Sequence, residues 1–275
     1  MKRISINICS KDRPSELAIC VSSLLASSFK DWDLVVLDDG GGTPVQKYKF
    51  IDDVFKRVVY EDHGFQLIRN KFSLLNIGKA RNQLIREDEF QNPLILRVDD
   101  DSWVHPDYLQ MLYDELIKDD KCGGIGGTVP LMSGPNHYRN VKVLGGVFNE
   151  IKYDKKGNIT YLGDDGGLDY NVNSIMPSHH LRSSWLFRRD ASSTVGHFPL
   201  DYGVTGFREE THWSIAMRYA GYSLKTVTQA MAFHMPCLSG GARIQNYPQV
   251  VRMNDEHFRR WAKWQFEKNG GEPGV

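Results

Sequence analysis

Two short apolar runs, each ending in a cluster of acidic residues, constrain the fold of this 275-residue chain most strongly. The runs, at residues 34–37 and 94–98, are followed by Asp38, Asp39 and three glycines in one case and by Asp99, Asp100 and Asp101 in the other. A short continuous apolar run that stops at turn residues is typical of a strand buried on both faces of a parallel sheet. Because ligands bind beyond the carboxyl ends of such strands, both acidic clusters are expected at one edge of the sheet.

The first half of the chain alternates strand-like and helix-like segments. This alternation favours right-handed β-α-β crossovers and an α/β fold, with a mostly parallel central sheet and helices on both faces. The expected strands are residues 4–9, 34–37, 94–98 and, more weakly, 57–60, and the expected helices are residues 14–27, 79–87 and a segment opening at Pro106.

The second half changes character, with many Gly, Asn and Asp residues between about 123 and 173. We expect a hairpin turn at 154–158, strands at 183–188, 222–227 and 230–234, and helices at about 209–220 and 255–268. The sequence contains no internal repeat or linker, which favours a single domain over residues 1–275. We divide it at the change of character into residues 1–122, residues 123–240 and a C-terminal loop with an amphipathic helix (241–275).

Composition excludes several classes of protein. Lys plus Arg and Asp plus Glu both total 34, so the chain lacks the excess of basic residues expected of a protein that binds nucleic acid. The four cysteines form no C-x-x-C pair, which argues against a zinc ribbon or a disulfide-rich secreted scaffold and favours a cytoplasmic protein. No stretch reaches the ~20 apolar residues of a membrane span, so we expect at most peripheral membrane contact.

The carboxylates that follow residue 98 are candidates for metal chemistry. Asp99 and Asp101 are two residues apart and point to one face if the chain stays extended. Two carboxylates there repel each other, and a hard cation such as Mg²⁺ or Mn²⁺, which prefers oxygen ligands, would relieve the repulsion. This interpretation gives a metal clamp on a nucleotide diphosphate. The alternative is a solvated acidic turn that caps the helix near Pro106.

Three further candidate groups each have an ordinary structural alternative. Asp38 or Asp39 could accept hydrogen bonds from a nucleobase or a ribose, or could belong to a common Asp-Gly turn. Glu209 and Glu210 open a predicted helix, where they could supply a general base or only complement the helix dipole. His234 becomes a metal-ligand candidate only if the fold brings it to Asp101.

Weaker candidates surround these groups. Lys79 and Arg81, at the start of a predicted helix, could neutralise phosphate. Arg243 could contact the diphosphate from a Ser-Gly-Gly-Ala-Arg loop, which could equally be a flexible turn. Tryptophans could stack against sugar faces, although tryptophan is more often part of a core; they are Trp103, Trp185 and Trp213.

Taken together and in this order, the motifs resemble the inverting family-2 glycosyltransferases of the GT-A fold. The matching segments are ISINICSKDRP (4–14), VLDDGG (36–41), NIGKARN (76–82), VDDD (98–101), GFREET (206–211) and AFH (232–234). The joint pattern, which spans roughly residues 1–240, is far more specific than any single motif.

The resemblance implies a metal-dependent transfer of a sugar, with inversion, from a UDP-linked donor to a hydroxyl of a glycan, a lipid-linked sugar or another acceptor. It implies that Asp38 or Asp39 holds the base, Asp99 the ribose and Asp101 with His234 the Mn²⁺ or Mg²⁺ ion, and that Glu210 is the general base. It also implies that Ser10, Lys11, Asp12 and Asp100 belong to the donor site, that residues 1–122 are the donor-binding half and that residues 123–240 are the acceptor-binding and catalytic half. Glu209-Glu210 replaces the usual Glu-Asp, so which of the two acts stays open, and His212 stands where an acidic residue is common.

Two other functions remain as alternatives. A nucleotidyltransferase would share the sheet and the acidic clusters, but it normally has a glycine-rich basic loop after the first strand, where this chain has Ser-Lys-Asp-Arg-Pro. A non-catalytic module that binds a nucleotide sugar or a glycan would release no nucleotide.

Overall fold

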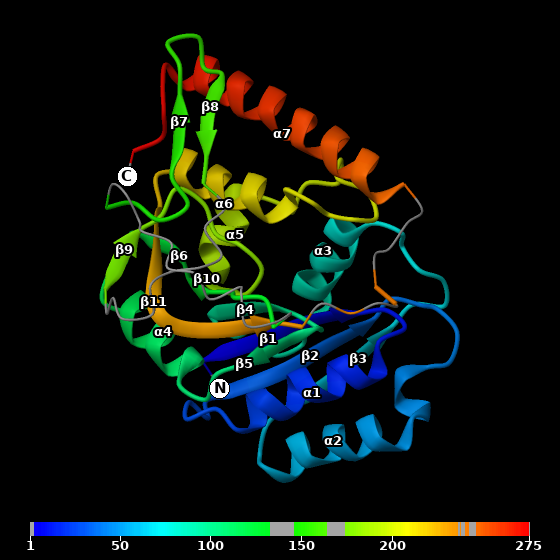
Figure 1. The fold of residues 1–275 in the computed structure, drawn as a ribbon. Helices are drawn as coiled ribbons and strands as arrows, with labels where there is room; N and C mark the ends of the chain where they lie inside the picture. The colour runs from blue at the N-terminus through cyan, green and yellow to red at the C-terminus, as the bar shows by residue number, and fades with distance from the viewer. Residues whose placement is uncertain are drawn as a thin grey trace.

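A sheet runs through the middle of the molecule, with helices packed on both of its faces (Figure 1). The computed structural model of the chain describes residues 3–132, 146–163, 174–235, 237, 240–241 and 246–274. Within these residues the sheet has nine strands in the order β3-β2-β1-β4-β10-β6-β11-β5, and β9 pairs with β11.

The N-terminal elements form the parallel part of the sheet. They are β1 (Ile4–Ser10), α1 (Pro14–Leu25), β2 (Trp32–Asp38), the 3-10 helix η1 (Val45–Lys47), α2 (Lys49–Tyr60), β3 (Phe65–Arg69), α3 (Ile77–Glu87) and β4 (Leu94–Asp99). Strand β1 pairs in parallel with both β2 and β4, so that Ser10 lies beside Asp38 and Cys9 beside Asp99. The carboxyl ends of the three strands therefore meet at one edge, and the two acidic clusters lie there together.

The remaining elements extend and cover the sheet. They are β5 (Ser102–Val104), α4 (Tyr108–Leu116), β6 (Cys122–Thr128), β7 (Ile151–Tyr153), β8 (Ile159–Leu162), β9 (Ile175–Pro177), β10 (Trp185–Arg188), α5 (Arg189–Val195), α6 (Glu209–Tyr219), β11 (Ser223–His234) and α7 (Tyr247–Asn269). Strand β11 runs parallel to β6, whereas β10 is antiparallel to β4 and β6. Most paired residues lie in parallel ladders, and the predicted α/β fold is confirmed.

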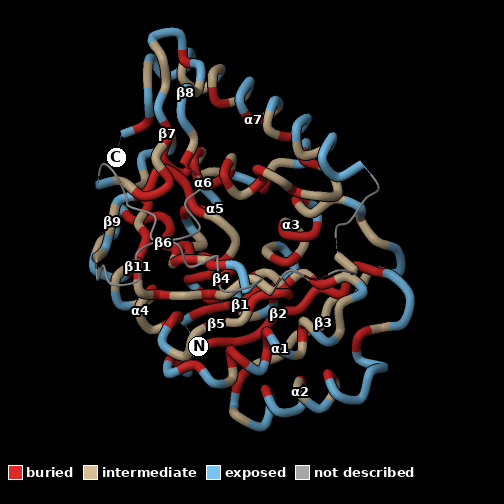
Figure 2. The backbone as a smooth tube through the Cα atoms, viewed as in Figure 1, coloured by how far each residue is buried: buried red, intermediate tan, exposed pale blue. Residues whose placement is uncertain are grey.

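Apolar packing assigns each helix to a face of the sheet. Helices α1, α2 and α4 share one hydrophobic cluster with β1, β2 and β4 on one face. Helices α3, α5 and α6 contribute to the clusters of the opposite face. The central strands β1, β2, β4, β6 and β10 are almost continuously buried (Figure 2). Burial on both faces is what the uninterrupted apolar runs predicted.

Helix α7 lies apart from the sheet and packs on the β7–β8 hairpin and on α6. Phe258 and Ala262 of this helix are buried in one cluster with Ile151 of β7 and Ile215 of α6. The hairpin agrees with the predicted turn at 154–158. None of the helices in the described part of the chain is long and apolar enough to cross a membrane.

The strand predicted at residues 57–60 is wrong. These residues form the last turn of α2, in which Ile51, Phe55 and Val58 are buried at spacings of four and three along the chain. This is the period of an amphipathic helix, and a four-residue window rich in valine conceals it. The third parallel strand is β3, which begins at Phe65.

The C-terminal predictions need two corrections. Residues 222–227 and 230–234 belong to one strand, β11, whose pairing with β6 is irregular between Thr226 and Met231. This irregularity, rather than a turn, interrupts the apolar pattern. Helix α7 begins at Tyr247, well before Asp255, and carries a proline in its first turn.

Candidate active site

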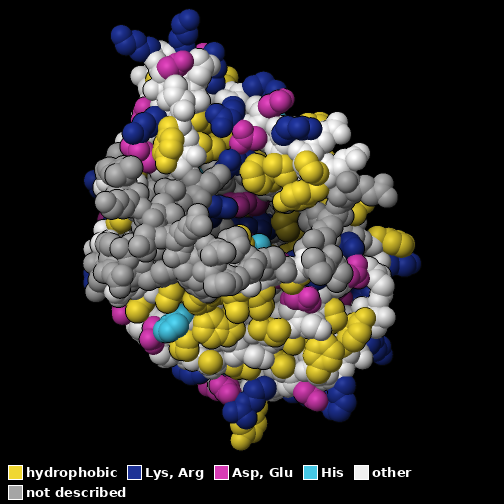
Figure 3. Space-filling model, viewed as in Figure 1, with side chains coloured by type: hydrophobic (Ala, Val, Ile, Leu, Met, Phe, Trp, Pro, Cys, Tyr) yellow, Lys and Arg dark blue, Asp and Glu magenta, His cyan; other side chains and the backbone are white. Residues whose placement is uncertain are grey.

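A cleft of about 720 Å³ opens at the edge of the sheet where β1, β2 and β4 end. The start of α6 and the end of β11 also line this cleft. Acidic, basic and histidine side chains are visible inside the hollow, and hydrophobic side chains border part of it (Figure 3). Most of the predicted site residues line this cleft: Lys11, Asp39, Arg81, Asp99, Asp100, Asp101, Glu209, Glu210 and His234.

Five predicted donor residues, Asp38 among them, are not among the described residues that line the cleft. Ser10 is buried behind it, and its hydroxyl donates to Asp100 Oδ2 at 2.8 Å. Asp12 is exposed and accepts from Lys11 Nζ at 2.6 Å and from the amide of Gly42 at 3.1 Å. The Lys11 hydrogen bond lowers the pKa of Asp12. Lys79 is exposed on the first turn of α3. Arg243 lies outside the described residues.

The last of these five residues, Asp38, supports the turn after β2 rather than the cleft. Its Oδ2 accepts from Arg69 Nη1 at 2.7 Å and from the amide of Val45 at 3.1 Å. Arg69 lies opposite Asp38 in the register of β2 and β3, so the ion pair follows from strand pairing. Of the two carboxylates between which the sequence could not choose, Asp38 is thus the one turned away.

Asp39 faces the cleft and organises the loop that follows β3. Its carboxylate accepts from Asn70 Nδ2 at 2.9 Å, from the hydroxyl of Ser73 at 2.9 Å and from the amide of Leu74 at 3.0 Å. The glycine after it, Gly40, has a φ of 66°, and a Cβ there would lie 2.5 Å from the backbone of Ser73. Only glycine lets the two loops approach this closely.

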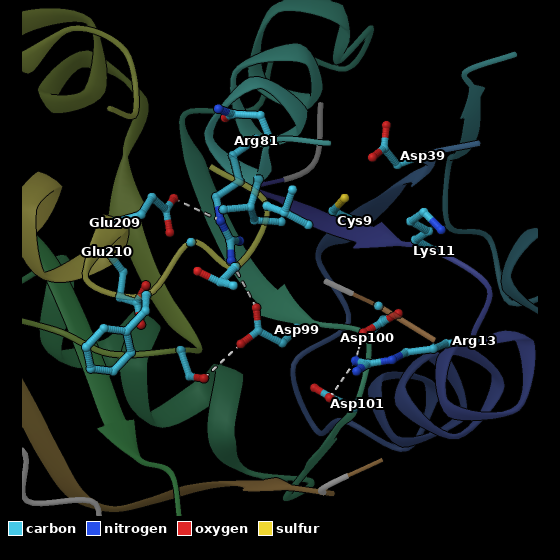
Figure 4. A pocket seen from close by; sticks show the side chains of 18 of the residues that line it. Cys9, Lys11, Arg13, Asp39, Arg81, Asp99, Asp100, Asp101, Glu209 and Glu210 are labelled. Atoms are coloured by element: carbon cyan, nitrogen blue, oxygen red, sulfur yellow. Dashed lines mark hydrogen bonds and ion pairs between the residues drawn. The ribbon is translucent and has the colours of Figure 1, made fainter. Parts of the chain in front are cut away.

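Two buried arginines bind two carboxylates in a group that we call the arginine tetrad, consisting of Arg81, Arg97, Asp99 and Glu209. Arg81 bridges the pair: its Nη2 lies 3.1 Å from Asp99 Oδ1 and its Nε lies 2.9 Å from Glu209 Oε1 (Figure 4). Arg97 Nη2 is 3.3 Å from Asp99 and 4.0 Å from Glu209. Both arginine side chains are at most 9% exposed. The tetrad therefore joins α3, β4 and α6 with balanced charge.

The two carboxylates of the tetrad shift their pKa values in opposite directions. Burial opposes the charged form of Asp99, but Arg97, Arg81 and a 2.8 Å hydrogen bond from the Ser183 hydroxyl outweigh it and hold the pKa well below its usual range. Burial raises the pKa of Glu209 to about 7 against the pull of the same arginines, and the neighbouring Glu210 adds to the increase.

A second group of charges, which we call the Arg13 cluster, consists of Arg13, Asp100, Asp101 and His234. Arg13 Nη1 donates to Asp101 Oδ2 at 2.6 Å and to Asp100 Oδ1 at 3.1 Å (Figure 4). His234 Nε2 lies 3.3 Å from the same oxygen of Asp101. The hydrogen bond with Asp101 raises the pKa of His234, and burial raises the pKa of Asp100 to about 7 despite Arg13.

Strand pairing explains how His234 reaches the acidic turn. At the end of β11, His234 lies opposite Ser102 of β5, the residue after Asp101. The amide of Met235 also donates to the carbonyl of Asp101 at 2.7 Å. The condition that the sequence left open, that the fold bring His234 to Asp101, is met.

The adjacent glutamates at the start of α6 have different surroundings. Glu209 is 1% exposed and held by the tetrad, whereas Glu210 is partly exposed and lines the cleft. Arg208 precedes them with a φ of 76°, and the amide of Glu209 donates to Gly206 at 2.8 Å. This tight turn into the helix sends consecutive side chains in different directions.

The tryptophans that could stack on a sugar, and His212, pack against other side chains and are not among the described residues that line the cleft. Trp185 and Trp213 are buried in the core between the sheet and α6, and Trp103 packs against Phe233. His212 stacks on Trp261 of α7 with ring centroids 3.6 Å apart, and burial lowers its pKa to about 3. Core packing, rather than sugar stacking, therefore accounts for Trp185 and Trp213, and His212 packs against α7.

Sequence reasoning missed Arg13, Arg97 and Ser183. The available signal for Arg97 was an arginine inside the apolar run at 94–98, because a charge in a buried strand requires a partner. Arg13 directly precedes Pro14, and an arginine just before a predicted helix is usually a surface residue. No local pattern marks Ser183, whose role depends on the long-range pairing of β10 with β4.

The model of glycosyl transferase family 2 matches residues 5–172, more than half of the chain. The chain belongs to glycosyl transferase family 2. It is therefore a glycosyltransferase, as the motifs indicated. No curated protein sequence matches it.

Solved structures share the fold of this glycosyltransferase at low sequence identity. GalNAc-T7 with UDP, GalNAc and Mn²⁺ aligns with a TM-score of 0.65 and 14% identity over 99% of this chain and 56% of that one. Staphylococcus aureus TarS aligns with a TM-score of 0.58 and 12% identity over 91% of this chain and 38% of TarS. The TarS fragment 1–349 in complex with UDP-GlcNAc aligns with a TM-score of 0.60 and 12% identity over 91% of this chain and 65% of the fragment. The glycosyltransferase spans less than two thirds of these chains, and at this identity the likeness establishes the GT-A fold.

The residues of the Arg13 cluster fit a divalent cation in part. No group of three or more His, Cys, Asp or Glu side chains gathers at metal-binding distances within the described residues. Asp101 and His234 nevertheless converge at 3.3 Å in the cleft, and they offer one hard oxygen and one imidazole nitrogen. Two protein ligands with open positions suit Mn²⁺ or Mg²⁺ when donor phosphates supply the remaining oxygens.

Proposed function

We propose that this glycosyltransferase is a metal-dependent, inverting enzyme that transfers a sugar from a UDP-linked donor to an acceptor hydroxyl. The observation that carries the proposal is that Glu210, a partly exposed carboxylate, lines the same cleft as the acidic turn that holds Asp99 and Asp101. UDP and Mn²⁺ in the GalNAc-T7 structure, and UDP-GlcNAc in the TarS structure, support the choice of donor and ion.

On the donor side, the ordered carboxylates supply hydrogen-bond acceptors. We assign the nucleobase to Asp39, because it faces the cleft while Asp38 is bound to Arg69. We assign the ribose hydroxyls to Asp99, whose oxygens retain acceptor capacity beside their present donors. Lys11 lines the same side and offers a positive charge to the phosphates. Asp101 and His234 would hold the cation, which stabilises the negative charge of the departing nucleotide diphosphate.

On the acceptor side, Glu210 acts as the general base. It takes the proton of the acceptor hydroxyl as that oxygen forms a bond to the anomeric carbon. The bond between this carbon and the diphosphate oxygen breaks on the opposite face, and its electron pair leaves with the nucleotide. A single displacement of this kind inverts the anomeric centre. We assign the base to Glu210 rather than to Glu209, whose carboxylate is buried in the tetrad.

The two sides of the cleft retain the predicted division of the single domain. Residues 1–122 would bind the donor, and residues 123–240, followed by 241–275, would bind the acceptor. Val204, Phe207 and Tyr247 line the acceptor side. Their apolar and aromatic surfaces suit the face of a sugar ring, so we propose a glycan or a lipid-linked sugar as the acceptor.

We also infer that the enzyme acts in the cytoplasm. All four cysteines, Cys9, Cys20, Cys122 and Cys237, are free thiols in the structure. Unpaired cysteines of this number are typical of a reducing compartment.

The test is the release of nucleotide diphosphate from UDP, GDP and dTDP sugars, with Mn²⁺ or with EDTA. We expect release from a UDP sugar that EDTA, Asp101→Ala and Glu210→Gln each reduce at least about a hundredfold. Glu210→Gln should still bind UDP like the wild type, because the proposal assigns Glu210 to the acceptor hydroxyl and not to the nucleotide. Release of pyrophosphate from a nucleoside triphosphate, or donor binding without turnover with any acceptor tried, would contradict the proposal.

A further inference from the structure

Arg13 occupies the place where a cation bound to Asp101 would lie. Its guanidinium donates to Asp101 Oδ2 at 2.6 Å, and His234 Nε2 lies 3.3 Å from the same oxygen. The Arg13 side chain is 11% exposed, and the Asp101 side chain is 8% exposed. A divalent ion held by Asp101 and His234 would compete with this guanidinium for one carboxylate oxygen and would repel its charge.

The local structure holds Arg13 closely in this position. Arg13 is the N-cap residue of α1, and its side chain makes no capping hydrogen bond there. The turn at Gly240 and Gly241 packs against it: a Cβ on Gly241 would lie 2.5 Å from Arg13 Nη2. Both glycines have left-handed φ values, 70° and 66°. The amide of Gly241 donates to the backbone carbonyl of Lys11 at 2.8 Å. Asp100 provides a second acceptor at 3.1 Å.

We propose that Arg13 is an exchangeable counter-ion of Asp101, which the divalent cation displaces when the donor binds. This inference rests on the proposed metal site. Before binding, Arg13 balances the charge of the acidic turn. When the cation binds Asp101, the guanidinium loses that partner and the nearby diphosphate of the donor provides a new one, since guanidinium pairs well with phosphate.

A measurable coupling follows from this exchange. The cation alone must break the contact between Arg13 and Asp101, so it binds weakly. With the nucleotide bound, Arg13 has another anionic partner and the same contact no longer opposes the cation. UDP therefore strengthens Mn²⁺ binding, and by thermodynamic reciprocity Mn²⁺ strengthens UDP binding by the same factor.

The experiment measures the dissociation constant of Mn²⁺, from the electron paramagnetic resonance signal of free Mn²⁺, with and without UDP. The ratio of the two constants is the coupling factor. In Arg13→Gln we expect Mn²⁺ to bind about tenfold more tightly without UDP, and the coupling factor to fall about tenfold, since a hydrogen bond between charged groups is removed. The ratio cancels any general effect of losing one positive charge.

The matched control is Arg69→Gln. Arg69 also pairs with an aspartate at the end of a parallel strand, Asp38 at 2.7 Å, but neither residue lines the cleft. Its coupling factor should stay within about twofold of the wild type. If Arg13→Gln does not fold, Arg13→Lys serves instead, and its coupling factor should lie below that of the wild type, because lysine keeps the charge but lacks the planar fork.

An unchanged coupling factor in a folded Arg13 variant would overturn the inference, and so would an absence of Mn²⁺ binding to Arg13→Gln without UDP. Asp101→Asn separates this outcome from a failure of the metal site itself. If the wild type binds Mn²⁺ and Asp101→Asn binds it equally well, the proposed metal site is wrong whatever the Arg13 variants show. Loss of binding in Asp101→Asn with unchanged coupling in the Arg13 variant refutes the exchange alone.

Discussion

The arginine tetrad and the Arg13 cluster lie in the same cleft and differ in how their charges are balanced. In the tetrad, Arg81 and Arg97 come from a helix and a central strand and match two carboxylates. In the Arg13 cluster, a single guanidinium serves Asp100 and Asp101, with one histidine beside them. A balanced group built on regular elements has no need of a further ion, whereas a group with excess carboxylate attracts one. The comparison suggests that the tetrad is a fixed support and the Arg13 cluster the exchangeable part.

The largest expected difference between the two groups is in stability. Arg97→Met leaves the buried Glu209 and the partly exposed Asp99 with too little positive charge and should lower the free energy of unfolding by about 3–5 kcal/mol. Arg13→Met should cost less, about 1–2 kcal/mol, because Arg13 precedes α1 at the edge of the cleft, whereas Arg97 lies within β4 and also donates to the carbonyl of Ser183. Denaturant unfolding in EDTA measures both. The double variant Arg97→Met with Glu209→Gln should recover part of the loss, and equal losses in the two single variants would break the comparison.

The second difference concerns the ion. Asp101→Asn should weaken Mn²⁺ binding in the presence of UDP by about tenfold or more, since a charged ligand is replaced by a neutral one. Asp99→Asn should change it by less than about threefold, because Asp99 is bound by Arg81, Arg97 and Ser183. Titration calorimetry with the UDP-bound protein gives both constants. A larger effect at Asp99 than at Asp101 would mean that the cation binds at the tetrad and not at the Arg13 cluster.

The third difference is a pH dependence that arises within the tetrad. Because the pKa of Glu209 is raised to about 7, the folded protein binds a proton there that the unfolded chain releases near its ordinary pKa of 4.5. This proton stabilises the fold below about pH 4.5, and the contribution is lost as the pH rises toward 7, by at most about 1.4 kcal/mol per pH unit. Asp99 contributes the opposite dependence, at lower pH, because its pKa is lowered.

Unfolding experiments between pH 5 and 7 in EDTA check this sign. Glu209→Gln should show a flatter dependence than the wild type over this interval, since glutamine has no proton to lose. Glu210→Gln is the companion variant at the neighbouring position. Because Glu210 contributes to the raised pKa of Glu209, stability in this variant should depend on pH less than in the wild type and more than in Glu209→Gln. Parallel curves for all three proteins would show that Glu209 does not titrate in this range.

The same comparison explains what the sequence could predict. The strands before Asp38 and Asp99 were predictable because an apolar run and the acidic turn after it are adjacent in the chain. The contacts of Arg81 with Asp99 and Glu209 were not, because they depend on how α3, β4 and α6 pack together. The choice between Asp38 and Asp39 required the register of β2 with β3, which places Arg69 beside Asp38. The four-residue strand at 57–60 failed because such a window is shorter than the helical period it belongs to.

The smallest expected effect concerns two lysines, Lys11 and Lys79, which the sequence predicted as donor-binding residues. Lys11 lines the cleft with its side chain 29% exposed, whereas Lys79 is exposed on α3 and is not among the described residues that line it. Lys11→Ala should weaken UDP binding in the presence of Mn²⁺ by about fivefold, the effect of a charge pair worth about 1 kcal/mol. Lys79→Ala should change it by less than about twofold, and both effects should shrink at high salt because exposed charges are screened. Fluorescence titration with a labelled UDP measures the two constants under identical conditions. A larger loss in Lys79→Ala would mean that the phosphates lie nearer the start of α3 than the Arg13 cluster, and the donor would then have to be placed along α3 instead.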